Sequence, residues 1–242
     1  MAHTDLNPRP HGPPAPATTD RDHQNWLRMW RKDQTDFHQH SVNPLLTRFW
    51  VSQSLPRPGR IFVPLCGKSL DLIWLAAQGN EVIGVELSPV AIKSFFRENG
   101  LAARKNKRGR FTVWESGRIR ILGGDFFQLT PAELGDIDIV YDRAALTALP
   151  EDLRAPYVAH LRAIVPSTCS IFLLTLADQD PADDVLSPVP EDDIDDEIRS
   201  LYAPHFDIDM AHREAGLEAD AEHPSAAPVA VEHTVYRLTP RA

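Results

Sequence analysis

The sequence predicts a single open α/β domain, in which a mainly parallel sheet carries helices on both faces. Apolar runs rich in β-forming residues, such as residues 61–63 and 137–141, alternate along the chain with segments of helical spacing. The first of these runs leads into a loop with a lone glycine, as expected where a parallel strand meets a ligand. A chain of 242 residues with 43% hydrophobic content is long enough for one such core and too short for two ordinary domains.

Residues 61–72, IFVPLCGKSLDL, give the strongest ligand-binding signal in the chain. The first three residues predict a central strand that is buried on both faces, and Ser69 is expected to cap the helix that follows. Gly67 lets the backbone pass close to a ligand. Ligands of open α/β sheets lie beyond the carboxyl ends of the strands, where a helix N-terminus presents unpaired N–H groups. The segment therefore predicts a small-molecule site.

Glu86 follows Gly67 by nineteen residues and ends a second apolar run, within EVIGVELSP. In nucleotide-binding α/β folds, an acidic residue about 20 residues after the glycine loop accepts hydrogen bonds from a ribose diol. The alternative for Glu86 alone is an ordinary exposed carboxylate at a strand end. The single glycine fits poorly with the G-x-G-x-x-G loop of NAD or FAD sites, and the phosphate-binding G-x-x-x-x-G-K-[ST] motif is absent. A ligand with a ribose and no pyrophosphate, such as S-adenosylmethionine, fits better.

Four separated blocks, VPLCGKSLDL, EVIGVELSP, GGDFF and VYDRAAL, carry a family resemblance in their order and spacing. Together they resemble the bacterial form of the thiopurine S-methyltransferase family, from about Trp26 to about Leu176. The resemblance implies a Rossmann-like, seven-stranded methyltransferase sheet with an antiparallel C-terminal strand, and S-adenosyl-L-methionine as the cofactor. It also implies methyl transfer to a thiol of the thiopurine or aromatic type, with reduced selenium or tellurium species as further acceptors.

The glycine loop, its spacing to Glu86 and the resemblance together give a set of expected site residues. The expected cofactor-binding residues are Trp30, Leu65, Gly67, Glu86, Asp125, Phe126 and Arg143. The expected acceptor-pocket residues are Trp26, Phe37, His38 and Arg143. Aromatic faces attract a sulfonium as they attract an ammonium. Each role has a structural alternative, because the tryptophans also suit a core, Asp125 suits a helix N-cap, and Arg143 suits an ion pair with a neighbour.

We expect neither a catalytic general base nor a metal ion. The sulfonium is a good leaving group and an acidic thiol can enter as its thiolate, so in-line placement supplies most of the acceleration. His38 and His40 form an H-x-H pair without an obvious third ligand, which is weak evidence for a metal. Two other interpretations stay open, namely a nicotinamide-dependent oxidoreductase on the same type of sheet and a non-catalytic small-molecule-binding or interaction protein.

Charge and cysteine content limit the partners and the compartment. The net charge of −9 argues against nucleic acid or an anionic membrane as a general partner. Cys66 and Cys169 build neither a disulfide framework nor a zinc cluster, and no apolar run near the first residue resembles a signal or membrane segment. We therefore expect a cytoplasmic monomer that acts on a small thiol or selenol and binds neither nucleic acid nor membrane.

The chain divides into an arm and a domain. Residues 1–24 hold five prolines and almost no large apolar side chains, which predicts a disordered N-terminal arm before a methyltransferase domain of residues 25–242. Within the domain, the basic run at 104–110 is expected to form a solvated loop, followed by a hairpin of residues 111–114 and 118–122.

Two segments depart from the family pattern. Residues 178–197 hold ten acidic and no basic side chains, which predicts a surface loop leading into a helix around residues 192–201. DDVLSPVP stands there in place of the family's G-P-P-F segment, and HPSAAP stands in place of arginines before the final V-Y-R-L strand. These departures leave the natural methyl acceptor open.

Overall fold

The computed structural model describes residues 20–35, 38–50, 59–178, 195–218 and 229–241. Its helices are α1 (Asp20–Arg31), α2 (Pro44–Phe49), α3 (Asp71–Ala77), α4 (Pro89–Glu98), α5 (Pro131–Leu134), α6 (Glu151–Ile164) and α7 (Asp196–Tyr202), with a 3-10 helix η2 (Phe126–Gln128). Its strands are β1 (Arg60–Val63), β2 (Glu81–Glu86), β3 (Arg104–Arg108), β4 (Phe111–Ser116), β5 (Ile119–Gly123), β6 (Ile139–Arg143), β7 (Ser170–Asp178), β8 (Phe206–Glu218) and β9 (Val229–Pro240).

Part of the predicted N-terminal arm is helical. The predicted boundary between arm and domain follows residue 24, whereas α1 already begins at Asp20. Residues 1–19 lie outside the described residues, so the arm itself stays a prediction. The acidic segment likewise lies mostly outside them, and the helix expected around residues 192–201 is the shorter α7.

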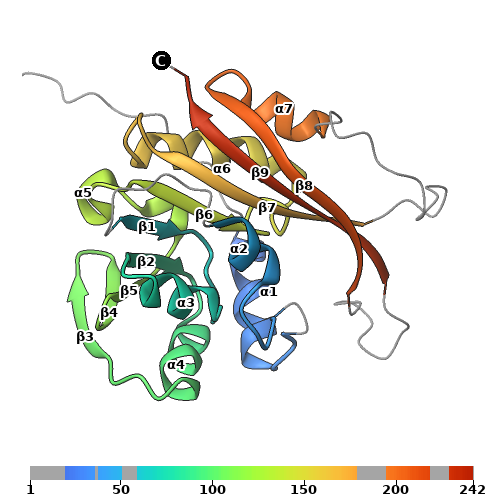
Figure 1. The fold of residues 1–242 in the computed structure, drawn as a ribbon. Coiled ribbons are helices and arrows are strands. Elements are labelled where there is room, and N and C mark those ends of the chain that lie inside the picture. Colours follow the sequence, from blue (N-terminus) through green and yellow to red (C-terminus); the bar gives the residue numbers. More distant parts are fainter. Residues whose placement is uncertain (1–19, 36–37, 51–58, 179–194, 219–228, 242) are drawn as a thin grey trace, which may run out of the picture.

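The described strands form one sheet in the order β3-β4-β5-β2-β1-β6-β7-β9-β8 (Figure 1). The pairs β5-β2, β2-β1, β1-β6 and β6-β7 are parallel, whereas β9 runs antiparallel to both β7 and β8. The predicted α/β class, with a parallel centre and an antiparallel C-terminal strand, is confirmed. The predicted number of seven strands is wrong, because the described part of the chain already forms nine.

Strands β3 and β4 account for the extra strands at one edge of the sheet. The basic run that was expected to be a loop forms β3, which pairs with β4 across a two-residue turn in which Gly109 has a φ of 56°. Every side chain of β3 is exposed, so the segment is solvated as expected, but its backbone completes a ladder. Positive charges on such an edge discourage pairing with a strand of another molecule.

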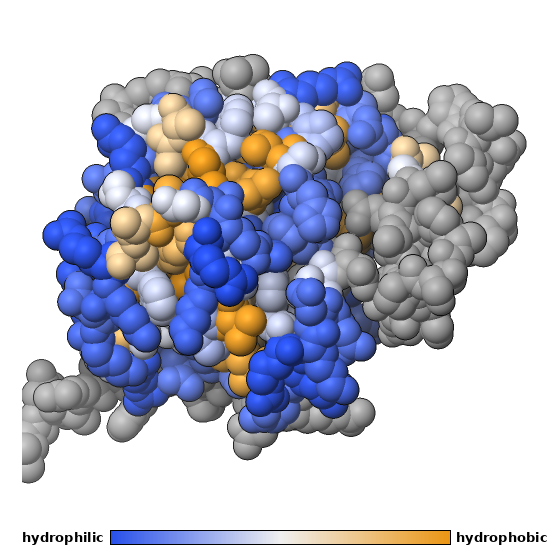
Figure 2. Space-filling model, turned by 90° about the horizontal axis from the view of Figure 1, so that it is seen from below, coloured by the Kyte–Doolittle hydropathy of each residue, from blue (hydrophilic) through white to orange (hydrophobic). Residues whose placement is uncertain are grey.

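Helices cover both faces of the sheet, as predicted. On one face, the core includes Tyr157 and Leu161 of α6, and on the other it includes Leu72 of α3 and Phe95 of α4. The central strand β1 is buried towards both faces, which agrees with its unbroken apolar sequence. Figure 2 shows one face of the molecule, where a few apolar side chains gather between hydrophilic ones. None of the described helices is long and apolar enough to cross a membrane.

The cap predicted for the helix after the glycine loop is displaced by one residue. Leu70 is the N-cap of α3 and makes no side-chain capping bond. Ser69 Oγ accepts a hydrogen bond from Asp71 N at 3.2 Å, so Ser69 shapes the turn that enters the helix. Ser88, by contrast, caps α4 by accepting a bond from Ala91 N at 3.3 Å.

Candidate cofactor and acceptor site

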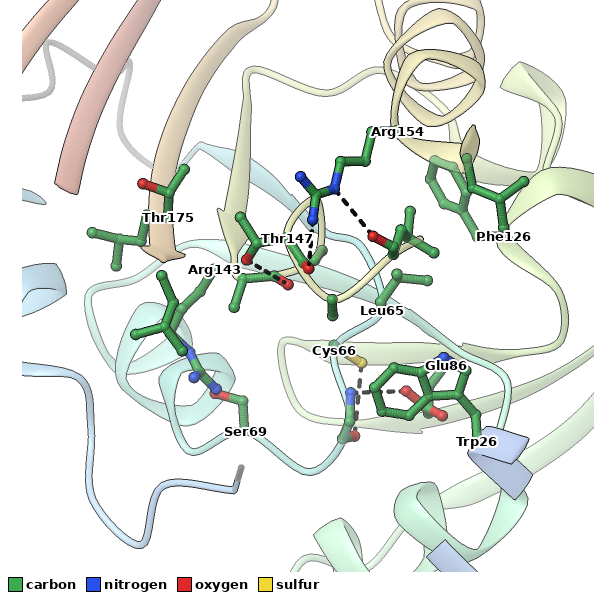
Figure 3. Close-up of a pocket in the computed structure, with 18 of the residues that line it drawn as sticks. Trp26, Leu65, Cys66, Ser69, Glu86, Phe126, Arg143, Thr147, Arg154 and Thr175 are labelled. Carbon is green, nitrogen blue, oxygen red and sulfur yellow. Dashed lines mark hydrogen bonds between the residues drawn. The ribbon is translucent and has the colours of Figure 1, made fainter. Parts of the chain in front are cut away.

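The carboxyl ends of the central strands border a cavity of about 620 Å³, over which α1 lies. Every predicted site residue lines this cavity except Phe37, which falls outside the described residues. In Figure 3, Glu86 and Trp26 lie on one side of it, and Arg143 and Thr175 on the other. We call the walls built from residues 65–67, 86–87 and 125–127 the β2 side, and the walls built from residues 143–154, 174–176 and 195–198 the α7 side.

The glycine loop turns sharply as it leaves β1. Leu65 and Gly67 have positive φ angles of 45° and 54°. Glycine adopts such angles readily, whereas leucine does so only at a cost. A Cβ atom at Gly67 would lie 3.3 Å from Trp30 Cζ2, so the missing side chain also makes room for the indole of α1. The loop therefore brings its backbone to the cavity and seats the helix that covers it.

Glu86 ends β2 as a buried carboxylate, with 6% of its surface exposed. Its Oε2 accepts a hydrogen bond from Gly67 N at 2.9 Å, and its Oε1 accepts one from Ser88 N at 2.6 Å. Burial raises the pKa of the carboxyl to about 7, although the backbone N–H donors favour the charged form. A carboxylate has about four acceptor positions, so capacity for a ligand hydroxyl remains. The alternative of an ordinary exposed carboxylate is wrong.

Asp125 follows β5 and is the N-cap of η2, because its Oδ1 accepts a hydrogen bond from Phe127 N at 2.9 Å. The capping alternative raised by the sequence is therefore present. Asp125 also lines the cavity, and His23 of α1 approaches the same oxygen at 3.7 Å. The adjacent Phe126 is buried and packs against Tyr157. This wall thus combines the apolar ring of Phe126 with the carboxylate of Asp125, which can accept hydrogen bonds.

Arg143 lies at the end of β6 and is held by a carboxylate from the helix after the glycine loop. Asp71, only 1% exposed, accepts hydrogen bonds on Oδ2 from Arg143 Nε at 3.0 Å and from the Tyr141 hydroxyl at 2.9 Å. Its Oδ1 accepts a third bond from Asn43 N at 2.8 Å. Arg143 does pair with a neighbour, as the structural alternative expected, and its guanidinium also reaches Ser69 Oγ at 3.4 Å. The pairing fixes the guanidinium at the cavity.

His38 lines the cavity close to positive charges. Burial, together with the nearby charges of Lys68, His40 and Arg143, lowers the pKa of its imidazole to about 4. Lys68 itself forms an ion pair with Glu98 at 3.0 Å. An imidazole with this pKa is neutral at pH 7. Among the described residues, no group of three His, Cys, Asp or Glu side chains is placed to hold a metal ion.

The model of the thiopurine S-methyltransferase family matches residues 21–241. The chain belongs to this family. The thiopurine S-methyltransferase of Stutzerimonas stutzeri (strain A1501) is 56% identical over 91% of this chain and 92% of that protein. The thiopurine S-methyltransferase of Methylococcus capsulatus (strain Bath) is 42% identical over 81% of this chain and 88% of that protein. The resemblance stated from four sequence blocks is confirmed, and the match extends well beyond Leu176.

Solved structures show the same fold at low identity. A methyltransferase dependent on S-adenosylmethionine from Anabaena variabilis has a TM-score of 0.57 at 17% identity, over 91% of this chain and 95% of the other. The 1,6-didemethyltoxoflavin-N1-methyltransferase of Burkholderia thailandensis, which holds S-adenosylhomocysteine, has a TM-score of 0.56 at 15% identity, over 96% and 93%. This thiopurine S-methyltransferase family member is thus an enzyme that uses S-adenosyl-L-methionine. Family membership excludes the oxidoreductase and the non-catalytic interpretations.

The residues present fit that cofactor. The end of β2 offers one buried carboxylate with spare acceptor capacity for ribose hydroxyls, which is the group that the spacing from Gly67 predicted. Leu65 and Phe126 provide apolar surface, and Trp30 brings its indole ring to the glycine loop. The single-glycine loop matches a ligand that carries no pyrophosphate.

Sequence reasoning missed several residues that line the cavity or support its lining. Asp71, which fixes Arg143, lies within the quoted block GKSLDL, where it gave only the signal of an acidic residue at a helix start. His23 fell inside the predicted arm. Arg154 of α6 and Glu197 of α7 form an ion pair at 2.6 Å, and no local pattern joins residues so far apart in sequence.

Proposed function

We propose that this enzyme methylates the sulfur of a small thiol, of the thiopurine or aromatic type, without a dedicated general base. The observation that carries the proposal is the charge around His38. Lys68 and Arg143 stand near a neutral imidazole at the cavity, where positive charge stabilises a thiolate and where His38 is a weak proton acceptor. The thiopurine S-methyltransferases to which the chain is similar support the same acceptor class.

We assign the proposed contacts to the cofactor or to the methyl acceptor. The proposed cofactor contacts are Trp30, Leu65, Gly67, Glu86, Asp125, Phe126 and Arg143. Glu86 accepts bonds from the ribose hydroxyls, and Asp125 with Phe126 forms the adenine wall. The proposed acceptor contacts are Trp26, Phe37, His38 and Arg143, of which Phe37 is carried over from the family resemblance alone.

The chemistry is a single in-line displacement. S-adenosylmethionine supplies a methyl group on a sulfonium, which is a good leaving group. The thiol proton passes to water before transfer, and the guanidinium of Arg143, fixed at the cavity by Asp71, favours the thiolate form of the acceptor. As the new sulfur–carbon bond forms, the old one breaks, and the products are a thioether and S-adenosylhomocysteine. Binding the two reactants in line supplies most of the acceleration. Selenols and tellurols are softer nucleophiles and fit the same scheme.

A matched acceptor series tests this proposal. The purified enzyme is assayed with methyl-labelled cofactor and with a thiol, a selenol, a phenol and an aniline that share one aromatic ring. We expect kcat/KM for the thiol to exceed that for the phenol by at least about 100-fold, and to rise with pH until the thiol is fully ionised. Transfer only to oxygen or nitrogen, or a strict requirement for magnesium, would show that the proposed chemistry is wrong.

We also propose that the enzyme acts as a monomer in the cytoplasm. Cys66 and Cys169 are buried free thiols, which suits a reducing compartment. The cavity is lined by elements of one chain, so no second copy is needed to complete it. Light scattering coupled to size-exclusion chromatography tests the monomer, and a dimer mass at assay concentration would contradict it.

A further inference from the structure

Arg154, in the first turn of α6, reaches back over the connection that joins β6 to its own helix. Its Nε donates a hydrogen bond to Leu149 O at 3.1 Å, and its Nη2 donates one to Thr147 O at 3.4 Å (Figure 3). Its third nitrogen, Nη1, donates to Glu197 Oε2 at 2.6 Å. One guanidinium therefore joins two carbonyl groups of the connection to a carboxylate of α7.

The connection that Arg154 holds forms part of the α7 side of the cavity. Residues 143–150, apart from Leu146, line it. The connection starts with Ala144 at a φ of 57°, a conformation that is costly for any residue but glycine. At that end, Asp142 Oδ1 accepts hydrogen bonds from Ala145 N at 3.0 Å and Leu146 N at 3.4 Å. A strained segment persists only where its surroundings fix it, so the far end needs a second fixing point.

Arg154 is that second fixing point, and side chains of α6 support both ends of the connection. Tyr157, one turn further along α6, donates its hydroxyl to Asp142 Oδ2 at 2.7 Å, which holds the first fixing point. Arg154 holds the other end through the carbonyls of Thr147 and Leu149. Because residues three apart on a helix lie on the same face, the two side chains act on the connection together.

Glu197 links Arg154 to α7, which forms another part of the cavity wall. It lies in the first turn of α7 and lines the cavity beside Ile198. The Arg154–Glu197 pair is part-buried, and it spans 43 residues of sequence. The β2 side has its own supports, because Glu86 is bound by backbone N–H groups of the glycine loop and of Ser88.

We propose that Arg154 is a positioning residue that sets the acceptor compartment, through the carbonyls of Thr147 and Leu149 and through Glu197. This inference rests on the proposed function, since it takes the acceptor to bind beside Arg143, at the start of the connection that Arg154 holds. Arg154 does not touch the reacting atoms. Its loss lets the connection and α7 move apart, which weakens acceptor binding and leaves the cofactor site on the β2 side unchanged.

Two substitutions and a matched control test the proposal. Arg154→Lys keeps the charge, but an ammonium cannot span three acceptors as the planar guanidinium does. We expect the acceptor KM to rise about tenfold in Arg154→Lys and about threefold in Glu197→Gln, with kcat and the Kd for S-adenosylhomocysteine within about twofold of wild type. Arg162→Gln, at an exposed position of the same helix, is expected to change none of these constants. Thermal melting confirms that each variant is folded.

Exchanging the two charges distinguishes the role of the hydrogen bonds from Arg154 to the carbonyls from the role of its ion pair with Glu197. Arg154→Glu combined with Glu197→Arg restores opposite charges, but a glutamate cannot donate to the two carbonyls, so we expect KM to stay high. An unchanged KM in folded Arg154→Lys, an equal loss of S-adenosylhomocysteine affinity, or full rescue by the exchange would overturn the proposal. If wild type turns over an oxygen or nitrogen acceptor instead of a thiol, the proposed chemistry fails, and the same KM comparison is made with that acceptor.

Discussion

The two sides of the cavity are held in different ways. On the β2 side, the carboxylate of Glu86, which lines the cavity, is bound by backbone N–H groups at positions 67 and 88, beside strands that pair in register. On the α7 side, the polar groups are held by other side chains. Arg143 depends on Asp71, 72 residues away, and Arg154 depends on Glu197.

This difference predicts how each side responds to mutation. Backbone donors in the turns that follow paired strands stay in place when one side chain changes, so substitutions on the β2 side are expected to alter ligand affinity more than stability. A buried carboxylate that pairs with several side chains leaves them all unsatisfied when it is removed. Substitutions at the supports of the α7 side should therefore cost stability or acceptor binding.

The largest expected effect is that of Asp71→Ala on stability. The substitution leaves the Tyr141 hydroxyl, the backbone N–H of Asn43 and the guanidinium of Arg143 without the carboxylate that accepts their hydrogen bonds. Breaking a buried charge pair in this way costs about 3–5 kcal/mol of the free energy of unfolding. Urea unfolding followed by fluorescence measures it.

The control for Asp71→Ala is Asp209→Ala, whose ion pair with Arg237 lies at the surface at 3.4 Å. This control is expected to cost less than about 1 kcal/mol. A loss of the same small size for Asp71→Ala would show that the side-chain network does not support the α7 side.

Glu86→Ala is expected to act on cofactor binding. Removal of the charged acceptor from the proposed ribose contact weakens S-adenosylhomocysteine binding by about 1–3 kcal/mol, as measured by calorimetry. The unfolding free energy is expected to change less than in Asp71→Ala, because the freed N–H group of Gly67 borders a cavity that water can enter. Unchanged affinity in the folded variant would refute the ribose assignment.

Gly67→Ala tests whether the backbone of the glycine loop matters for the ligand. Because Gly67 has a positive φ, a side chain there raises the conformational free energy of the loop by about 1–2 kcal/mol, and the new Cβ would press on Trp30. We expect the free energy of S-adenosylhomocysteine binding to weaken by a similar amount. Gly100→Ala is the matched control, because Gly100 also has a positive φ, 63°, but a Cβ there meets nothing within 4 Å. This control should lose stability and keep its affinity; equal affinity losses in both variants would contradict a specific role for the loop.

The smallest expected effect is a pH dependence of cofactor binding. The raised pKa of Glu86, about 7, means that the carboxyl must lose a proton before ribose hydroxyls can donate to it as a carboxylate. We expect S-adenosylhomocysteine to bind about tenfold more tightly at pH 8 than at pH 6 in wild type, and the dependence to disappear in Glu86→Gln. Isothermal titration in buffers of different ionisation enthalpy also detects the released proton.

As the pH rises, the stability of the ligand-free protein should fall, whereas the affinity for S-adenosylhomocysteine should increase. The folded pKa of Glu86 lies above its ordinary value of 4.5, so the native state holds this proton more tightly than the unfolded chain does. The stability that this proton contributes is complete below pH 4.5 and is lost as the pH rises through 7. Wild type should therefore lose stability relative to Glu86→Gln over this range. A constant difference between the two proteins would contradict the raised pKa.

The sequence alone determined the features that depend on neighbouring residues. Gly67 and Glu86 belong to two successive strand ends, and parallel strands bring their carboxyl ends to one edge, so their meeting follows from the order of elements. The apolar run of β1 likewise predicted its burial on both faces. The capping alternative for Asp125 followed from its residue type.

Only the tertiary structure decided the contacts that join distant segments. The strand β3 forms because β4 offers it a partner, although its charged sequence favours solvent. The supports of Arg143 and of the connection after β6 come from α3, α6 and α7, whose side chains meet only after the sheet has assembled. Local propensity carries no information about such meetings, because a charged residue looks the same in sequence whether its partner is water or a carboxylate 43 residues away.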